Sequence, residues 1–179
     1  MDIYDAIKSR TTVYSYSERP VPDETIIKIL DAGRLAPAAA GISEYEFLVV
    51  TEQEKKDAIS SVCLTPRINS APFIIMVFCD PAKLVATFGQ EDGMTLCVEN
   101  AALAIENILL YAASLGLGTA WIATVKQDEL RKVVGIPEKY IIRGVIPVGY
   151  PSDDSPRQTP QRKPDLKEIT HIDSFDTKA

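Results

Sequence analysis

The segment 108–125 constrains this chain most, because it contains no charged residue and is long enough to cross a lipid bilayer. Gly116 and Gly118 interrupt its middle, and Ser114 and Thr119 lie beside them. A buried helix, a glycine turn and a buried strand in direct succession produce the same pattern, and we prefer this interpretation to a membrane span. The segment therefore predicts two consecutive elements of one core, and we expect no association with a membrane.

The apolar pattern elsewhere predicts a domain that mixes helices and strands. The helix before the glycine turn is expected over about 94–115, and its apolar stripe is wide enough for a core or a large subunit interface. Residues 73–79 form a continuous apolar run, typical of a central strand covered on both faces. We also expect strands at 45–50, 119–125 and 140–150, and helices at 2–9, 23–35, 51–62 and 127–134. Their loose alternation predicts an α+β or mixed-sheet domain of three layers.

Local signals predict where several of these elements begin and end. Asp23 is a good N-cap for the second helix, and Thr51 with Glu54 has the spacing of a capping box. Gly135 is expected to end the last helix in the left-handed conformation. Pro147 lacks an N–H, so we predict an edge or bulge position for it within its strand.

Charge and cysteine content exclude several classes of protein. The 19 basic and 25 acidic residues give a net charge of −6, and no basic cluster is present, which argues against a nucleic-acid partner. Cys63, Cys79 and Cys97 are too few and too widely spaced for a disulfide scaffold or a zinc site, and they fit a reducing cytoplasm. His171 is the single histidine, so a site built from several histidines is impossible, and we expect no metal.

The chain of 179 residues has room for one domain, which we place at 1–150. From Pro151 onward the sequence is rich in proline and charge and has few apolar anchors. Such a segment is either disordered or lies across another surface, so we treat 151–179 as a C-terminal arm. Residues 82–93 have no clear pattern, and a mobile excursion is one interpretation of them.

Four stretches of the chain, in order, resemble the nitroreductase family of FMN-dependent NAD(P)H oxidoreductases. The first has Ser-Arg-Thr-Thr-Val at 9–13 and Arg-Pro-Val-Pro at 19–22, and the second has Leu-Asp-Ala-Gly-Arg-Leu-Ala-Pro at 30–37, followed by the strand at 46–50. The third runs from Glu-Asn-Ile-Leu-Leu at 106–110 to Gly-Leu-Gly-Thr-Ala-Trp-Ile at 116–122, and the fourth comprises 149–151, 162–164 and His171. Each stretch alone is weak, but their order covers nearly the whole chain.

The resemblance implies a fold, an assembly and an activity. The fold is a three-layer sandwich with a central, mostly antiparallel sheet, and the assembly is an intertwined homodimer whose C-terminal arm packs on the partner subunit. The activity is hydride transfer from NADH or NADPH to FMN and then to a small acceptor such as a nitroaromatic, a quinone or free flavin. Two alternatives stay open: an FMN enzyme specialised for one metabolite without nicotinamide, and a flavin-binding dimer without turnover.

The phosphate of FMN needs cationic and hydroxyl groups. Arg10 and Thr12 are two residues apart in a segment expected to be extended, which places both side chains on one side. From the sequence alone, a solvated cation at a helix end is the better explanation of Arg10. The resemblance assigns Arg10 and the hydroxyl residue to the phosphate, and it adds Arg162, followed by Lys163, from the arm.

The isoalloxazine ring needs an apolar slot and backbone amides that it can approach closely. The resemblance places the small residues Ala38, Ala39 and Gly41 around it, together with Trp121, Ile122, Ala123 and Thr124. Ala123 is expected to offer its backbone N–H to the flavin N5. Trp121 can equally be a core aromatic residue. No side-chain acid or base is expected to be catalytic.

Several positions depart from the family's pattern. Thr11 occupies the place of a second arginine, and Tyr14 replaces the cation that usually faces the flavin pyrimidine. Gly41 and Ser43 stand where Asn and Gln are common. A cation at position 14, near the flavin pyrimidine, would stabilise the negative charge of reduced flavin. We therefore expect the reduced state to be less favoured, unless Arg67 supplies the missing charge.

Overall fold

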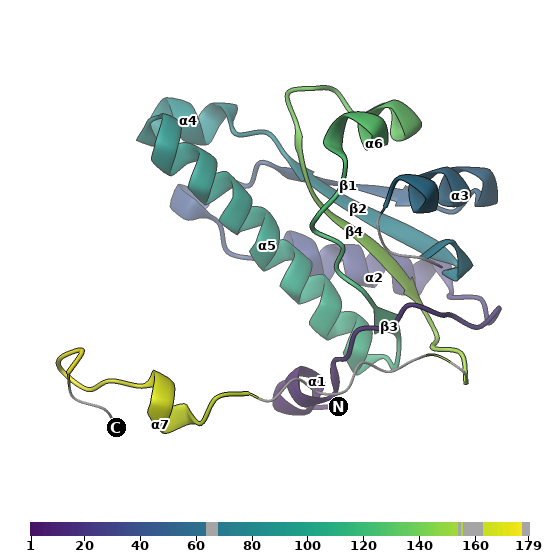
Figure 1. Cartoon of the computed structure of the whole chain (residues 1–179), viewed down its shortest axis with the longest axis horizontal. Helices are drawn as coiled ribbons and strands as arrows, with labels where there is room; N and C mark the ends of the chain where they lie inside the picture. Colours follow the sequence, from purple (N-terminus) through teal and green to yellow (C-terminus); the bar gives the residue numbers. More distant parts are fainter. Residues whose placement is uncertain (64–67, 154, 156–162, 177–179) are drawn as a thin grey trace.

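The computed structural model of the chain describes residues 1–63, 68–153, 155 and 163–176. The described residues form a four-stranded sheet in the order β1-β2-β4-β3, in which every neighbouring pair is antiparallel (Figure 1). Its strands are β1 (Tyr45–Val50), β2 (Phe73–Cys79), β3 (Gly118–Thr119) and β4 (Ile141–Gly149). The antiparallel sheet confirms this part of the expected fold class.

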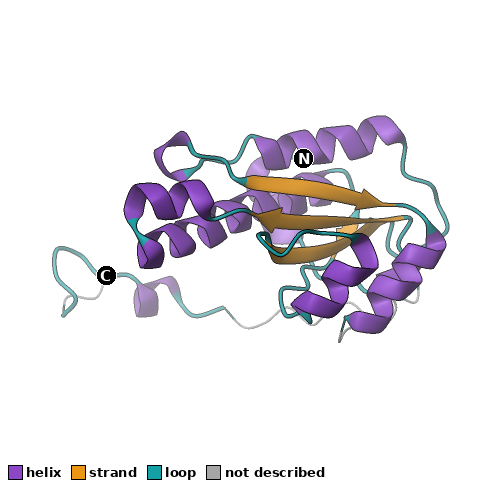
Figure 2. Ribbon diagram, turned by 90° about the horizontal axis from the view of Figure 1, so that it is seen from above, coloured by secondary structure: helices purple, strands orange, loops and turns teal. Residues whose placement is uncertain are grey.

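Helices cover both faces of the sheet, which confirms the three layers (Figure 2). One face packs against α2 (Asp23–Arg34), α4 (Ala82–Phe88) and the long α5 (Gln90–Ser114). The other packs against α3 (Gln53–Val62), α6 (Gln127–Val134) and the short turn η2 (Ile68–Ser70). The remaining helical segments are α1 (Ile3–Ser9), η1 (Ala39–Gly41) and α7 (Leu166–Ile169).

Strand β2 lies at the centre of the sheet, as its apolar run predicts. All of its residues are buried, and successive side chains point to opposite faces. Phe73, Ile75 and Val77 belong to the core beneath α5, whereas Ile74 and Met76 belong to the core beneath α3 and α6. A strand with both faces covered must be apolar throughout, so the sequence alone was sufficient here.

Helix α5 is the core helix that the sequence predicts, although it begins earlier, at Gln90. Its buried side chains include Cys97, Ala101, Ile105 and Ile108, which pack on the sheet and on α2. Within the described part of the chain it is the one helix whose length and apolar composition would suffice to cross a bilayer. Its packing in the centre of this fold accounts for that composition.

The strand predicted at 119–125 is largely wrong, because β3 contains only Gly118–Thr119. Beyond it the chain touches β4 through one bridge, in which Ile122 and Val145 each donate an N–H to the other's carbonyl at 3.1 Å. Two residues further along β4, on the same side, stands Pro147, which has no N–H to give. The ladder therefore breaks between these points, and the segment 120–124 stays irregular.

The edge position predicted for Pro147 is also wrong, since β4 lies between β2 and β3. A bulge does occur in this strand, but at Arg143. Val77 pairs with Gly144 and Phe78 pairs with Ile142, which leaves Arg143 without a partner in β2. The proline is tolerated because its nitrogen faces the interrupted side of the ladder.

Several predicted helix boundaries need correction. Pro22, rather than Asp23, is the N-cap of α2, and Glu52 is the N-cap of α3 without a capping hydrogen bond, so the capping box is absent. Gly135 ends α6 in the left-handed conformation at φ 74°, as predicted. Residues 82–93 form α4 and the start of α5 instead of an excursion, and Gly89 joins the two helices at φ 85°.

The start of the C-terminal arm is tied to the domain, and its described end extends away from it (Figure 1). Pro151 bridges Tyr16, and the N–H of Ser152 donates to the carbonyl of Ser15 at 3.1 Å. Further along, Leu166 is 72% exposed and Phe175 is 83% exposed. The expected contact with a partner subunit would cover these exposed apolar side chains.

Candidate functional site

A pocket opens where the end of α1 meets the turn after α5. Its volume is about 220 Å³, and it lies on the side of the molecule where the N-terminal segment, the glycine turn and the start of the arm converge. The lining residues are Met1, Ser9, Arg10, Thr11, Val13, Ala113, Gly116, Leu117, Gly118, Thr119 and Pro151. This set contains hydroxyl groups, glycines and one charged side chain, and it contains no carboxylate.

Arg10 is positioned by the end of α1. It is the C-cap residue, with φ −58° and ψ 121°, and its N–H donates to the carbonyl of Ala6 at 3.0 Å. The chain leaves the helix there and extends along β3. The Arg10 guanidinium makes no hydrogen bond or ion pair with any residue that the structure describes, so its charge is available to a ligand.

Thr11 and Thr12 are held beside the glycine turn by the backbone. Thr12 bridges Thr119, and the N–H of Val13 donates to the carbonyl of Thr119 at 2.9 Å. Gly118 is required here, because a Cβ on it would lie 2.8 Å from the side chain of Val13. The structure thus brings Arg10 and Thr11 to one pocket with Gly118 and Thr119, which lie far along the chain from them. The hydroxyl residue beside Arg10 in the lining is Thr11, and the predicted Thr12 is not among the lining residues.

Tyr16 fixes the segment that carries these residues. Its hydroxyl lies 2.6 Å from the carbonyl oxygen of Val13 and 3.1 Å from that of Pro147, and it has one proton to donate between them. Burial raises the pKa of Tyr16 well above its usual value, and the nearby Tyr14 raises it further. The phenol therefore stays protonated and keeps its donor. Tyr14 itself is half-buried beside this clamp.

The segment Trp121–Thr124 follows the pocket and runs beside β4. Trp121 is 37% exposed, and its indole Nε1 donates to the carbonyl of Arg143 at 3.0 Å. Ile122 is buried against the core, whereas Ala123 and Thr124 are exposed. Because the ladder breaks here, the backbone of this segment is not consumed by a regular strand.

The loop with Ala38, Ala39 and Gly41 does not join this pocket within one chain. The N–H of Ala39 donates to Oδ1 of Asn100 at 3.0 Å, which anchors the loop on the first half of α5. Asn100 and the pocket residue Ala113 are separated along α5 by about 20 Å at the helical rise of 1.5 Å per residue. The small-residue loop and the Arg10 pocket are therefore separate surfaces of a single chain.

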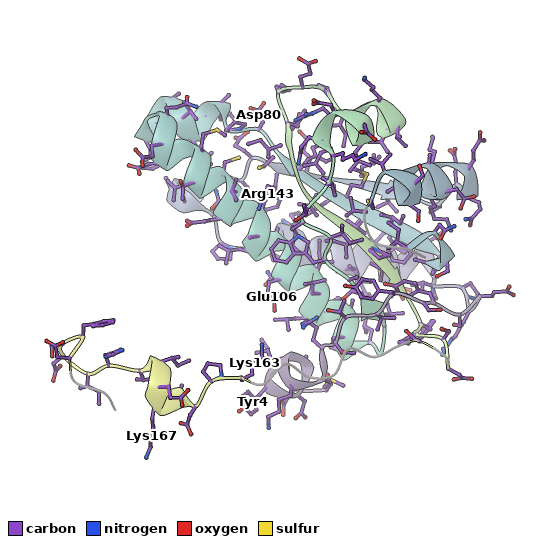
Figure 3. The ribbon with its side chains drawn as sticks, viewed as in Figure 1. Tyr4, Asp80, Glu106, Arg143, Lys163 and Lys167 are labelled. Atoms are coloured by element: carbon purple, nitrogen blue, oxygen red, sulfur yellow. The ribbon has the colours of Figure 1, made fainter. Side chains whose placement is uncertain are left out.

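Two of the predicted cations, Arg67 and Arg162, lie outside the described residues. Lys163 is described and exposed, at the start of the outer part of the arm (Figure 3). The structure describes twelve of the fourteen predicted residues. Nine of them belong to the Arg10 segment, the Trp121 segment or the arm, and the other three belong to the separate loop at 38–41.

Sequence reasoning missed some of the residues that complete the pocket. Thr119 was assigned to a buried strand, and Pro151 to the start of the arm, yet both line the pocket beside Arg10. Arg143 does not line this pocket but lies beside Trp121, and it had a visible signal in the sequence, since it is the single charged residue within the apolar strand 141–149.

The described domain is thus an antiparallel sheet covered by helices on both faces, with a pocket at its edge in which Arg10 is the one charged side chain of the lining. The sequence profile of the Nitroreductase family matches residues 7–66 and 60–150. The chain therefore belongs to the nitroreductase family.

Relatives with known names agree with this assignment. A protein of Methanothermobacter thermautotrophicus, provisionally named NADH dehydrogenase/NAD(P)H nitroreductase, is 35% identical over 159 residues, which is 86% of this chain and 80% of that protein. An NADPH-dependent oxidoreductase of Staphylococcus epidermidis is 21% identical over 97% of this chain and 74% of its own length. These names describe oxidoreductases.

Solved structures share the fold over nearly the whole chain. A crystal structure from Bacteroides thetaiotaomicron, with the same provisional name as the archaeal relative, has a TM-score of 0.81 at 29% identity and covers 97% of this chain and 98% of that one. An FMN-dependent nitroreductase of Clostridium difficile has a TM-score of 0.77 at 25% identity, covering 95% and 98%. The nitroreductase-like α+β fold expected from the sequence is confirmed.

Proposed function

We propose that this chain is an FMN-dependent oxidoreductase that passes hydride from NADH or NADPH to a small acceptor such as a nitroaromatic, a quinone or a flavin. The observation that carries the proposal is the Arg10 pocket, whose one charged side chain has no partner among the described residues and whose lining has no carboxylate. The FMN-dependent relative of known structure supports the choice of cofactor.

The pocket fits the phosphate end of FMN. Arg10 supplies a guanidinium fork that matches phosphate oxygens, and Thr11 and Thr119 supply hydroxyl groups beside it. A carboxylate in the lining would repel the phosphate, and none is present. Arg162 and Lys163 of the arm are proposed as further cations for the same group.

The segment Trp121–Thr124 is proposed to hold the ring system. FMN supplies the hydride chemistry when it is bound, and the protein supplies its orientation and its electrostatic environment. The break in the ladder at Pro147 leaves backbone groups of this segment for a ligand, and the exposed Ala123 leaves room for a close approach. No side-chain acid or base is assigned a catalytic role.

We further propose that the working unit is a homodimer, in the cytoplasm, with each arm packed on the partner subunit. A second chain would bring the loop at 38–41 to the site from which it is separated within one chain. It would also cover apolar side chains that are exposed on α1, α5 and the arm: Ile3, Tyr4, Ile7, Leu103, Leu166, Ile169 and Phe175. The buried, free cysteines are compatible with a reducing compartment.

An anaerobic titration tests this function. The protein, purified and loaded with FMN, is expected to be yellow and to lose its flavin absorbance on addition of NADH or NADPH, and the two titrations give the nicotinamide preference. Colour that persists with both nucleotides would replace this proposal by the enzyme without nicotinamide. A colourless protein that rejects added FMN would refute a flavin enzyme altogether.

A further inference from the structure

Arg143 is a charged residue within a strand that is otherwise apolar, and none of the described carboxylates forms an ion pair with it. The strand bulges at this residue, which has no partner in β2. Its Nε is buried without a hydrogen-bond partner, and no ion pair joins the guanidinium to a carboxylate of the described residues. A buried donor left unpaired is unfavourable, so a group that pairs with it would be bound favourably.

The acidic groups near this corner are already engaged. Asp80 and Glu44 act electrostatically on the same buried thiol, Cys97, as Arg143 does. Asp80 Oδ2 lies 2.9 Å from Nζ of Lys139, and Glu44 Oε1 lies 2.7 Å from Nζ of Lys83. Each of these two carboxylates is therefore paired with a lysine, and neither of them neutralises the positive charge of Arg143.

The neutral neighbours of Arg143 do not satisfy it either. Its guanidinium acts on Cys79 and Cys97, which are hydrogen-bonded to each other on the side of the sheet that α5 covers. Sulfur is a weak acceptor. Figure 3 shows Arg143 beside α5, with Asp80 nearer the α4 end of the molecule.

Arg143 also lies next to the segment assigned above to the flavin ring. Its carbonyl accepts the indole N–H of Trp121, and the side chain of Trp121 lies over the neighbouring Gly144, where a Cβ would be 3.0 Å from the indole nitrogen. Trp121 and Arg143 therefore share one corner of the surface, at the opposite end of segment 119–124 from the Arg10 pocket.

We propose that Arg143 and Trp121 form an anion subsite, which holds a carboxylate or phosphate group of the molecule that exchanges hydride at this site. The inference rests on the proposed function and adds a preference for anionic over neutral reactants. The guanidinium binds the anionic group, while the apolar part of the same molecule lies over the indole. An anionic acceptor and a nicotinamide nucleotide share this chemistry, and the test separates them.

Binding of a matched pair of ligands tests the subsite without turnover. Benzoate and benzamide have nearly the same shape and differ in charge. Titration calorimetry on the FMN-loaded protein, with the emission of Trp121, the single tryptophan, as a second signal, gives both affinities. We expect benzoate to bind about tenfold or more tightly than benzamide, as a charge-assisted contact requires.

Three variants make the comparison specific. Arg143→Gln should abolish the preference for benzoate, and Arg143→Lys should retain part of it, which also serves if the glutamine variant folds poorly. Arg34→Gln removes the same charge from an exposed arginine paired with Asp31 on α2, and it should leave the preference unchanged. Equal affinities for the two ligands in the unmodified protein would overturn the proposal. The proposal would also be overturned if Arg143→Gln dissociated a dimer as it lost the preference, because Arg143 would then act on the assembly and not on the ligand.

Turnover then identifies the source of the anionic group. A KM for 4-nitrobenzoate that is about tenfold below that for 4-nitrobenzamide, and that rises in Arg143→Gln, indicates the acceptor. A rise confined to the KM for NADH or NADPH indicates the nucleotide phosphates. If the protein prefers benzoate but neither nucleotide reduces its flavin, the proposed function is refuted and the subsite is retained. If a nucleotide reduces the flavin but benzoate is not preferred, the subsite is refuted and the proposed function is retained.

Discussion

At the scale of single residues, the proposed chemistry depends on two arginines that have no ion-pair partner among the described residues. Other arginines, such as the exposed Arg34 and the largely buried Arg131, have nearby carboxylates, with N–O distances of 2.7 and 2.8 Å. Arg10 and Arg143 have none among the described residues. Both lie beside the segment 118–124, and the proposals above assign each of them to the binding of an anionic group.

Substitution of Arg10 is the direct test of the phosphate site. Arg10→Gln should raise the dissociation constant for FMN about tenfold or more, because a charge-assisted contact to phosphate is lost. Equilibrium dialysis with FMN measures this. The exposed, paired Arg34→Gln is the control and should bind FMN like the unmodified chain. Unchanged binding in Arg10→Gln would move the phosphate away from this pocket.

Lys56 gives a second prediction at this scale, about stability. It is buried, and its Nζ donates to the carbonyl of Ala71 at 2.7 Å, holding the loop that precedes β2. Burial lowers the pKa of Lys56 in the folded protein. The unfolded chain therefore binds the proton more tightly, so the free energy of unfolding should rise with pH above the folded pKa and level off near the ordinary lysine value of 10.5.

Urea unfolding between pH 8 and pH 10, compared with Lys56→Met, measures this contribution. The unmodified chain should gain stability relative to the variant as the pH rises. The comparison cancels the contribution of Tyr16, whose raised pKa acts in both proteins. A difference between the two proteins that does not depend on pH would show that the amine is equally protonated in both states.

At the scale of elements, the close contact between the N-terminal segment and the glycine turn sets the geometry of the pocket. A methyl group on Gly118 would lie 2.8–3.0 Å from the branched side chain of Val13, which has little freedom to move. Gly118→Ala should therefore displace Thr12 from Thr119 and destabilise the fold by about 1–3 kcal/mol.

The same variant should also weaken FMN binding, measured by dialysis alongside urea unfolding. Adding Val13→Ala removes the obstructing methyl groups, so the double variant should recover part of the FMN affinity. If Gly118→Ala binds FMN normally, the phosphate does not depend on this contact. If the double variant recovers nothing, the clash with Val13 is not the cause.

The elements themselves show how far sequence patterns reach. The bounds of β1, β2 and α6 were predictable, because buried strands and left-handed glycine caps are local signals. The capping box at Thr51 failed because Glu52 begins the helix instead, and residues 82–93 failed because α4 is short and packs on α5 through Gly93. The prediction of a strand at 119–125 was wrong because the length of β3 depends on Pro147 in β4, which is far away in the sequence.

At the scale of the whole molecule, two features of the single chain motivate the proposed homodimer. Its small-residue loop and its Arg10 pocket lie apart along α5, and the described arm extends from the domain with its apolar residues exposed (Figure 1). Light scattering at micromolar concentration should therefore give twice the chain mass of 19.6 kDa. A stable monomer that binds FMN would refute the shared site.

The arm provides a sharper test of the same assembly. Leu166→Glu with Ile169→Glu changes two exposed side chains of α7, so it should not affect the stability of a monomer. If the arm packs on the partner, the charges should weaken the dimer, measured as a shift of its dissociation to higher protein concentration. Ala86→Glu, at an exposed position on α4, is the matched control and should leave dissociation unchanged.

The sequence by itself determined the core and the family. The apolar run of β2, the wide apolar stripe of α5 and the order of the four resembling stretches are properties of neighbouring residues, so they could be predicted without coordinates. The tertiary structure decided which side chains meet. It brought Arg10 to Gly118, kept Ala39 away from both, and left Arg143 unpaired because the nearby carboxylates are bound to Lys139 and Lys83. Such pairings depend on distances between segments far apart in the chain, and no local pattern encodes them.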